Sequence, residues 1–246
     1  MKITSVNNDI VKETAKLHQR KFRDESGLFL IEGEKCIEEA LDSGITIKRI
    51  FVTEGFNKFN KFEPIETNDA VLSKISTTDS APKAVAVGEK PKYKWSDKYK
   101  KVVLLENIKD AGNLGTILRT ACAFNIDAII LYGDTVDLYN PKCVRSSVGN
   151  LWKIPVFEIS DFDKLKEMFE NYERIGTLPK CSNSIWLNDY IPSEKTLLMF
   201  GAESTGLTNN LKDFATKNIT IEMSKNVESL NLSVSAAVIL YKFINA

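Results

Sequence analysis

Three short turns, each marked by glycine or asparagine, constrain the fold of this chain more than any other feature. They occupy residues 107–119, 200–207 and 221–233, and each follows a short apolar run. Such runs alternate with segments of helical period, a pattern typical of a mostly parallel sheet covered on both faces. Because parallel strands end at one edge of a sheet, we expect the polar groups of the three turns to gather there.

The sequence changes character between residues 88 and 101, where lysine, proline and aromatic residues follow neither a helical nor a strand period. Such a segment predicts a linker between domains. At 246 residues, the chain has room for two small domains. We therefore predict a small α/β domain at residues 1–90, a linker at 91–101 and a larger α/β domain at 102–246.

The first domain opens with apolar residues at helical spacing that are separated by basic ones. This pattern predicts a basic amphipathic helix over residues 8–24. A second helix is expected at 34–42, because Gly44 follows it. Apolar runs predict strands or strand-like segments at 29–31, 50–53, 70–75 and 84–87.

The second domain is predicted to alternate between strands and helices. The expected strands lie at 102–105, 128–131, 154–157, 174–177, 196–200 and 219–221. The expected helices lie at 113–124, 162–171 and 234–244. The last helix carries more apolar residues than one face of a surface helix needs, so a homodimer is also expected.

Composition and motif searches exclude several classes of protein. The chain has neither the glycine-rich dinucleotide fingerprint nor a P-loop. Its single histidine, His18, lies in the first domain, which excludes a histidine-based triad in the second. The isolated cysteines Cys36, Cys122, Cys143 and Cys181 predict free thiols and no metal site. The absence of a membrane-spanning run or signal-peptide pattern predicts a cytoplasmic protein.

Individual residues in the turns leave alternatives open. Gly201 and Gly206 either allow a ligand to approach the backbone or serve as ordinary turn residues. Arg119 interrupts an apolar helix, so it is either functional or paired in a salt bridge at the helix end. Asn231 and Ser233 are either polar groups of a site or caps of the helix that follows.

Taken together, the three turns resemble, in order and spacing, the signature motifs of the SpoU/TrmH-type RNA 2'-O-ribose methyltransferases of the SPOUT superfamily. The matching residues are Asn113, Gly115 and Arg119 in the first motif, Gly201, Glu203 and Gly206 in the second, and Ile221, Met223, Ser229, Leu230 and Asn231 in the third. The chain departs from the pattern at Ala111, where many members have proline, and at Asn150, where a small apolar residue is frequent.

The resemblance implies a trefoil-knotted, parallel-sheet methyltransferase domain, although knots are rare in proteins. It also implies an S-adenosylmethionine pocket in the knotted loops and a dimer built on the helix after the third motif. The residues implied to contact the cofactor are Gly201, Ile221, Met223, Leu230 and Ser233. The residues implied to act in catalysis are Arg119, Asn113, Glu203, Ser229 and Asn231.

Arg119 is the leading candidate for catalysis under this interpretation. A guanidinium does not lose its proton in proteins, so Arg119 is not expected to be a general base. We expect it to hold the target phosphate and to stabilise the developing alkoxide, while the other polar residues position the nucleotide.

The first domain is similar to the ribosomal-protein-like RNA-binding domain that precedes the knot in many of these enzymes. The likeness lies in the start at residues 5–8, the basic helix and the turn at 27–33. Lys+Arg and Asp+Glu both total 33, so any surface that binds RNA must be local. Tyr93 and Trp95 in the linker either stack on an unpaired base or are ordinary linker residues.

The expected function is S-adenosylmethionine-dependent 2'-O-methylation of RNA, with 23S rRNA as the leading substrate. Alternatives are methylation of tRNA and a non-catalytic RNA-binding module of the same fold. A dinucleotide oxidoreductase with an irregular loop is a more distant alternative, because its phosphate-binding fingerprint is missing.

Overall fold

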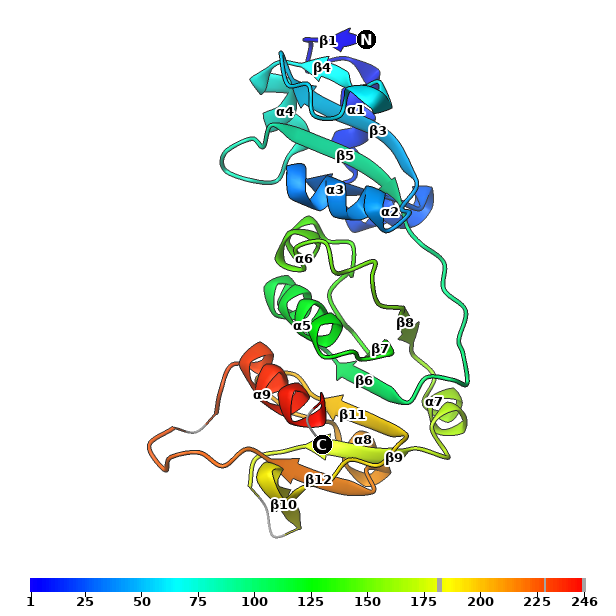
Figure 1. Cartoon of the computed structure of the whole chain (residues 1–246), viewed down its shortest axis with the longest axis vertical. Coiled ribbons are helices and arrows are strands. Elements are labelled where there is room, and N and C mark those ends of the chain that lie inside the picture. Colours follow the sequence, from blue (N-terminus) through cyan, green and yellow to red (C-terminus); the bar gives the residue numbers. More distant parts are fainter. Residues whose placement is uncertain (181–182, 228, 245–246) are drawn as a thin grey trace. The chain divides into compact units, whose positions relative to one another are not determined.

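The computed structural model describes residues 1–180, 183–227 and 229–244 (Figure 1). The chain forms two compact units, and the first consists of Met1–Lys92 together with Asp137–Lys153. The second consists of Tyr93–Val136 and Ile154–Ala246. The division after Lys92 falls inside the segment expected to be a linker. The return of Asp137–Lys153 to the first unit was not indicated by the sequence.

The first unit contains a mixed sheet with the strand order β1-β4-β3-β5-β2. Strand β5 is antiparallel to both β2 and β3, whereas β4 is parallel to β3 and β1. The strands are β1 (Lys2–Ile3), β2 (Leu28–Glu32), β3 (Ile47–Thr53), β4 (Ile65–Thr67) and β5 (Ala84–Glu89). The strands expected at 29–31, 50–53 and 84–87 are therefore confirmed.

Two expectations for the first unit are wrong. Residues 8–24 form two helices, α1 (Asp9–Lys16) and α2 (Arg20–Ser26), because Leu17 turns into the core and Gln19 is extended with ψ 136°. Residues 70–75 lie in helix α4 (Asp69–Ile75) and not in a strand. Asn68 caps this helix by accepting a hydrogen bond from the Val71 amide at 3.0 Å.

The helix α3 (Glu34–Asp42) forms at the expected residues, and a short 3-10 turn, η1 (Asn60–Phe62), follows β3. Helix α6 (Pro141–Ser146) lies in the segment that returns to the first unit. Asn140 caps α6 by accepting from the Lys142 amide at 2.9 Å, and Pro141 occupies the first turn, where its missing N–H costs nothing.

Buried charges and aromatic rings hold Asp137–Lys153 in the first unit. Arg23, only 2% exposed, donates from Nε to Asp137 at 2.7 Å and from Nη1 to the Leu17 carbonyl, also at 2.7 Å. The ring of Phe29 packs 4.8 Å from that of Tyr139. These contacts join residues far apart in the sequence, so no local sequence pattern predicts them.

The second unit is built on a seven-stranded sheet with the order β10-β12-β9-β11-β6-β7-β8. Every neighbouring pair in it is parallel, as the resemblance implied. The strands are β6 (Lys101–Glu106), β7 (Ala128–Tyr132), β8 (Val156–Ile159), β9 (Glu173–Thr177), β10 (Ser184–Trp186), β11 (Thr196–Phe200) and β12 (Lys217–Thr220). Six of them fall at or near the expected positions, and only β10 was not expected.

The helices expected in the second unit are also confirmed, with small shifts at their ends. They are α5 (Ala111–Ala123), α7 (Phe162–Met168) and α9 (Leu232–Ile244), and α5 and α9 pack against each other (Figure 1). A short helix, α8 (Asn209–Phe214), and a 3-10 turn, η2 (Leu187–Asp189), were not expected. None of the helices in the described part of the chain has the length and apolar character needed to cross a membrane.

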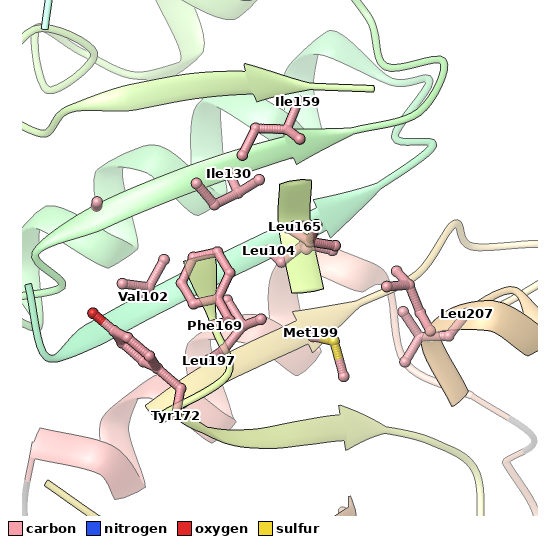
Figure 2. Packing of buried hydrophobic residues seen from close by; sticks show 12 residues of the cluster. Val102, Leu104, Ile130, Ile159, Leu165, Phe169, Tyr172, Leu197, Met199 and Leu207 are labelled. Atoms are coloured by element: carbon pink, nitrogen blue, oxygen red, sulfur yellow. The ribbon is translucent and has the colours of Figure 1, made fainter. Parts of the chain in front are cut away.

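One face of this sheet buries a cluster of apolar side chains from β6, β7, β11 and the segment around α7 (Figure 2). The linker contributes to it, because Trp95 packs edge-on against Tyr99, Phe157 and Phe169 at centroid distances of 5.1, 5.4 and 5.4 Å. Trp95 is thus occupied by packing, which favours a structural role over the stacking of an RNA base.

We predict that Asp137→Asn destabilises the first unit by about 3–5 kcal/mol, because Arg23 would be left as a buried charge without its partner. Hydrogen exchange of the β2 and β5 amides measures this loss in the first unit alone. The matched control is Glu89→Gln, which breaks the exposed ion pair between Lys48 and Glu89. This control should cost less than about 1 kcal/mol, and equal losses in the two variants would contradict the prediction.

Candidate active site

A pocket of about 380 Å³ lies at the carboxyl ends of three neighbouring strands, β9, β11 and β12. Its lining comes from residues 177–179, 200–206, 219–221 and 229–230, with Lys212 of α8, Met223, and Leu232, Ser235 and Ile239 of α9. The second and third turns of the sequence therefore meet in one place, as parallel strands require. This edge is where ligands bind in open α/β sheets.

The second turn closes tightly on itself. Gly206 donates its amide hydrogen to the Ala202 carbonyl at 2.8 Å, and its φ of +65° is one that glycine adopts without strain. A Cβ on Gly201 would lie 2.0 Å from the Gly206 carbonyl carbon and 2.2 Å from the Leu207 nitrogen. Gly201 is therefore needed for closure of the turn itself.

A buried carboxylate that the sequence analysis missed anchors this turn. Glu106, 1% exposed at the end of β6, accepts hydrogen bonds from the Thr208 amide at 2.8 Å and from its hydroxyl at 2.7 Å. Burial raises the pKa of the neighbouring Tyr132, and the Glu106 charge raises it further. The signal in the sequence was a lone acidic residue that ends an apolar strand.

Polar side chains from all three motifs form one hydrogen-bonded cluster. Asn113 donates from Nδ2 to Glu203 Oε1, and Asn231 donates from Nδ2 to both Glu203 Oε1 and Asn113 Oδ1, each at 3.2 Å. Asp110 fixes the position of Asn113 by accepting from its amide at 2.8 Å. We call Asn113, Glu203 and Asn231 the motif cluster.

Asn231 is both a member of the motif cluster and the cap of α9. Its Oδ1 accepts from the Ser233 amide at 2.9 Å and from the Ser233 hydroxyl at 2.7 Å. The two roles that the sequence left open for Asn231 are thus compatible, because the donor and acceptor atoms of its amide face different partners. Ser233 lies beside this cap and is not part of the described pocket lining.

The remaining expected site residues divide into two groups. Gly201, Ile221, Met223 and Leu230, which the resemblance implied as cofactor contacts, all line the pocket. Glu203 and Ser229, implied in catalysis, line it as well. The pocket thus brings together these predicted site residues, whereas Arg119, Asn113, Asn231 and Ser233 are not in its described lining.

Arg119 stands apart from the pocket. It lies on an exposed face of α5, and no other described residue forms a hydrogen bond or ion pair with it. The cost of burying this guanidinium therefore does not arise, and the alternative of a salt bridge at the helix end is not seen among the described residues.

The thiols and acidic groups form no metal centre in the described part of the chain, where no group of three or more His, Cys, Asp or Glu side chains converges. Cys36, Cys122 and Cys143 are not joined in disulfides, and burial raises the pKa of the Cys36 thiol. Cys181 lies outside the described residues.

The parallel sheet, the pocket at its edge and the motif cluster define an RNA methylase of the SpoU type. The chain belongs to the SpoU rRNA methylase family, whose model matches residues 100–241. Residues 8–86 match a second model, described as an MRM3-like substrate binding domain.

Relatives match over nearly the whole chain. It is 33% identical to the 23S rRNA (guanosine(2553)-2'-O)-methyltransferase RlmP of Bacillus subtilis, over 97% of both proteins. It is 31% identical to a protein of Synechocystis named an uncharacterized tRNA/rRNA methyltransferase, over 98% of this chain and 92% of that protein.

Solved structures match both units. An RNA 2'-O ribose methyltransferase superposes with a TM-score of 0.85 at 29% identity, over 100% of this chain and 98% of the other. The AdoMet-bound rRNA methyltransferase of Sinorhizobium meliloti superposes with a TM-score of 0.90 at 27% identity, over 100% of this chain and 97% of the other.

We predict that Gly201→Ala opens the second turn. The new methyl group would overlap the backbone of Gly206 and Leu207, which can move only if the turn itself moves. Hydrogen exchange of the residue-206 amide should become at least about tenfold faster. In the matched control, Gly206→Ala, the added Cβ meets no atom within 4 Å. That variant should keep the turn at a strain of about 1–2 kcal/mol. An intact turn in Gly201→Ala would contradict the geometry.

Proposed function

We propose that this protein transfers a methyl group from S-adenosylmethionine to a ribose 2'-hydroxyl of 23S rRNA. The observation that carries the proposal is the motif cluster, which joins the three family motifs beside one pocket. Membership of the family and the named activity of the Bacillus subtilis relative support the same reaction. Because the Synechocystis relative is named for both tRNA and rRNA, tRNA is the second substrate to test beside 23S rRNA.

The pocket lining fits S-adenosylmethionine, the cofactor bound in the Sinorhizobium meliloti structure. Phe200, Leu230 and Ile239 supply apolar surface suited to a flat adenine. Because Gly201 has no side chain, its backbone groups at the end of β11 are open to contact by the cofactor. When bound, this cofactor supplies an electrophilic methyl group on a sulfonium.

The residues of the chain must then position and activate the ribose hydroxyl, which is a poor nucleophile. The motif cluster holds the Glu203 carboxylate through two amide donors, so its charge faces the pocket in a fixed orientation. Arg119, free among the described residues, is available to bind the phosphate next to the reacting ribose and to stabilise the developing alkoxide.

We predict that Arg119→Ala slows methyl transfer by at least roughly a hundredfold, the scale of one lost transition-state donor. Its cofactor affinity should stay within about threefold of wild type, because Arg119 is not part of the described pocket lining. Arg119→Lys should remain slow, since an ammonium cannot reproduce the planar guanidinium fork. The measurements are single-turnover methylation of 23S rRNA fragments, with sites mapped by mass spectrometry, and titration with S-adenosylhomocysteine.

Because Arg119 is exposed, its removal leaves no buried charge and should not alter the melting temperature. A loss of activity can therefore be distinguished from a loss of stability. A folded Arg119→Ala with near wild-type turnover would end its catalytic assignment. A wild-type protein that methylates no position of 23S rRNA or tRNA would refute the proposed function itself.

The proposal includes a homodimer, a trefoil knot in the second unit and a cytoplasmic location alongside ribosomal RNA. The dimer is supported by helix α9, on which Val234, Val238 and Tyr241 are 47, 41 and 62% exposed. Their spacing of four and three residues places them on one face of the helix. Ala236, Ile239 and Leu240 of the same helix are already buried, so α9 is apolar on both sides.

We predict that the protein sediments at twice its chain mass of 27.7 kDa, and that Val238→Glu shifts it to the monomer. A buried carboxylate without a partner would oppose association through this face. The matched control is Ile191→Glu, because Ile191 is 80% exposed and lies outside α9. A wild-type monomer at micromolar concentration, or equal effects of the two variants, would contradict the proposed interface.

A further inference from the structure

A second pocket, of about 280 Å³, lies in the first unit between α1, α2 and the strands β2, β3 and β5 of the mixed sheet. Its inner surface includes Leu17 and Val87, which are 5% and 1% exposed. Phe22 of α2 also lines it and is only half-buried, so part of an aromatic ring is accessible in the pocket. The volume is just below the range of about 300–1,000 Å³ typical of drug-sized ligands, which suits a small flat group.

Two cations at this pocket have no ion-pair partner among the described residues. Lys16 lines the pocket with its ammonium 5.7 Å from the centre of the Phe22 ring. Arg49 lines it from β3, next to a β-bulge that lies between Ile47 and Arg49. Bulges redirect side chains, and this one sets Arg49 opposite Val87 at the pocket.

The neighbouring basic residues of α1 and α2 behave differently. Lys12 lies 3.7 Å from Asp9, Arg20 lies 3.4 Å from Asp24, and Lys21 lies 3.9 Å from Glu25, each within one helical turn. Their charges are largely compensated on the helix surface. Lys16 and Arg49 therefore keep their positive charge available for an anionic ligand, and both face the same pocket.

We propose that this pocket binds one unpaired nucleobase of the substrate RNA, stacked on Phe22, with Lys16 and Arg49 at the adjoining phosphates. The base would bury its apolar faces against Leu17 and Phe22, as bases do on aromatic platforms of single-stranded RNA-binding proteins. The carboxylates of Glu13 and Glu25, which also line the pocket, can accept hydrogen bonds from amino groups on the base edge.

This inference rests on the proposed RNA substrate, but it names a site outside the family motifs. The match of residues 8–86 to a substrate binding domain covers Phe22 and both cations, without assigning a role to any of them. Charge complementarity distinguishes the occupant, because an apolar peptide would leave Lys16 and Arg49 without partners. An unpaired base carries an apolar face and a phosphate within a few bonds of each other.

The test uses the full-length protein and a single-stranded RNA octamer with one 2-aminopurine, whose fluorescence falls on stacking. Wild type should quench the probe and bind it about tenfold more tightly than the matched octamer with an abasic site, the scale of one base–aromatic stack. Phe22→Leu, which keeps apolar volume but loses the aromatic face, should lose both effects. Phe22→Trp should retain them.

The matched control is Phe62→Leu. Phe62 is a 39% exposed aromatic residue of the same unit with Lys61 placed 4.8 Å from its ring centre, so it copies the chemistry outside the pocket. This variant should bind as wild type does. Arg49→Gln provides a second variant that does not touch the apolar lining, and it should weaken binding of both octamers.

Methylation assays on the same preparations separate this inference from the proposed function. With an rRNA fragment that the wild-type protein methylates as substrate, Phe22→Leu should raise KM about tenfold and leave kcat within twofold. Unchanged quenching and KM in Phe22→Leu would overturn the nucleobase site while leaving the methyltransferase function intact. Quenching that depends on Phe22 in a protein that methylates no RNA would refute the proposed function and leave the site.

Discussion

The parallel hydrogen bonding of β12, β9, β11 and β6 is the constraint on which the candidate active site depends. Strands β11 and β6 end level, because Phe200 pairs with Leu105, so the first and second motifs begin side by side. The third motif starts at the end of β12, with β9 between it and β11. Asn231 reaches the other motifs only because the chain crosses back toward α9, which packs against α5. The capping bonds of Asn231 on α9 then hold that returning segment in place.

Buried charges, more than apolar contacts, tie distant segments of each unit together. In the second unit, Glu106 connects the end of β6 to Thr208 across 102 residues of sequence. In the first, Glu32 accepts from the Thr77 amide at 2.8 Å and pairs with Arg145, which stands on α6. A carboxylate taken from water without its donors is costly, so each of these contacts penalises arrangements in which the distant segment is not docked. Apolar packing, which has no direction, discriminates less between such arrangements.

The elements predicted correctly from sequence share strong local signals. The strands β6, β7 and β11 are continuous apolar runs, and α3 and α5 have the period of buried helices, so local pattern and tertiary packing agree. The failures have the opposite character. The break at Leu17 depends on a hydrogen bond from Arg23, and the position of Trp95 depends on rings of β8 and the segment after α7. At the site, the motifs indicated which side chains gather. The anchoring of the second turn by Glu106 and the close approach of Gly201 to Gly206 are visible only in the three-dimensional structure.

The zero net charge of the chain changes how it must recognise RNA. Long-range attraction to phosphates is weak when positive and negative side chains are equal in number and paired within a helical turn, as on α1 and α2. Affinity must then come from contacts that operate at short range: stacking on accessible aromatic faces, cations that remain unpaired, and carboxylates that accept from base edges. Such contacts favour unpaired bases over regular duplex, because a base inside a helix offers neither face. With a balanced surface, short-range contacts of this kind favour RNA that presents an unpaired base over a regular duplex.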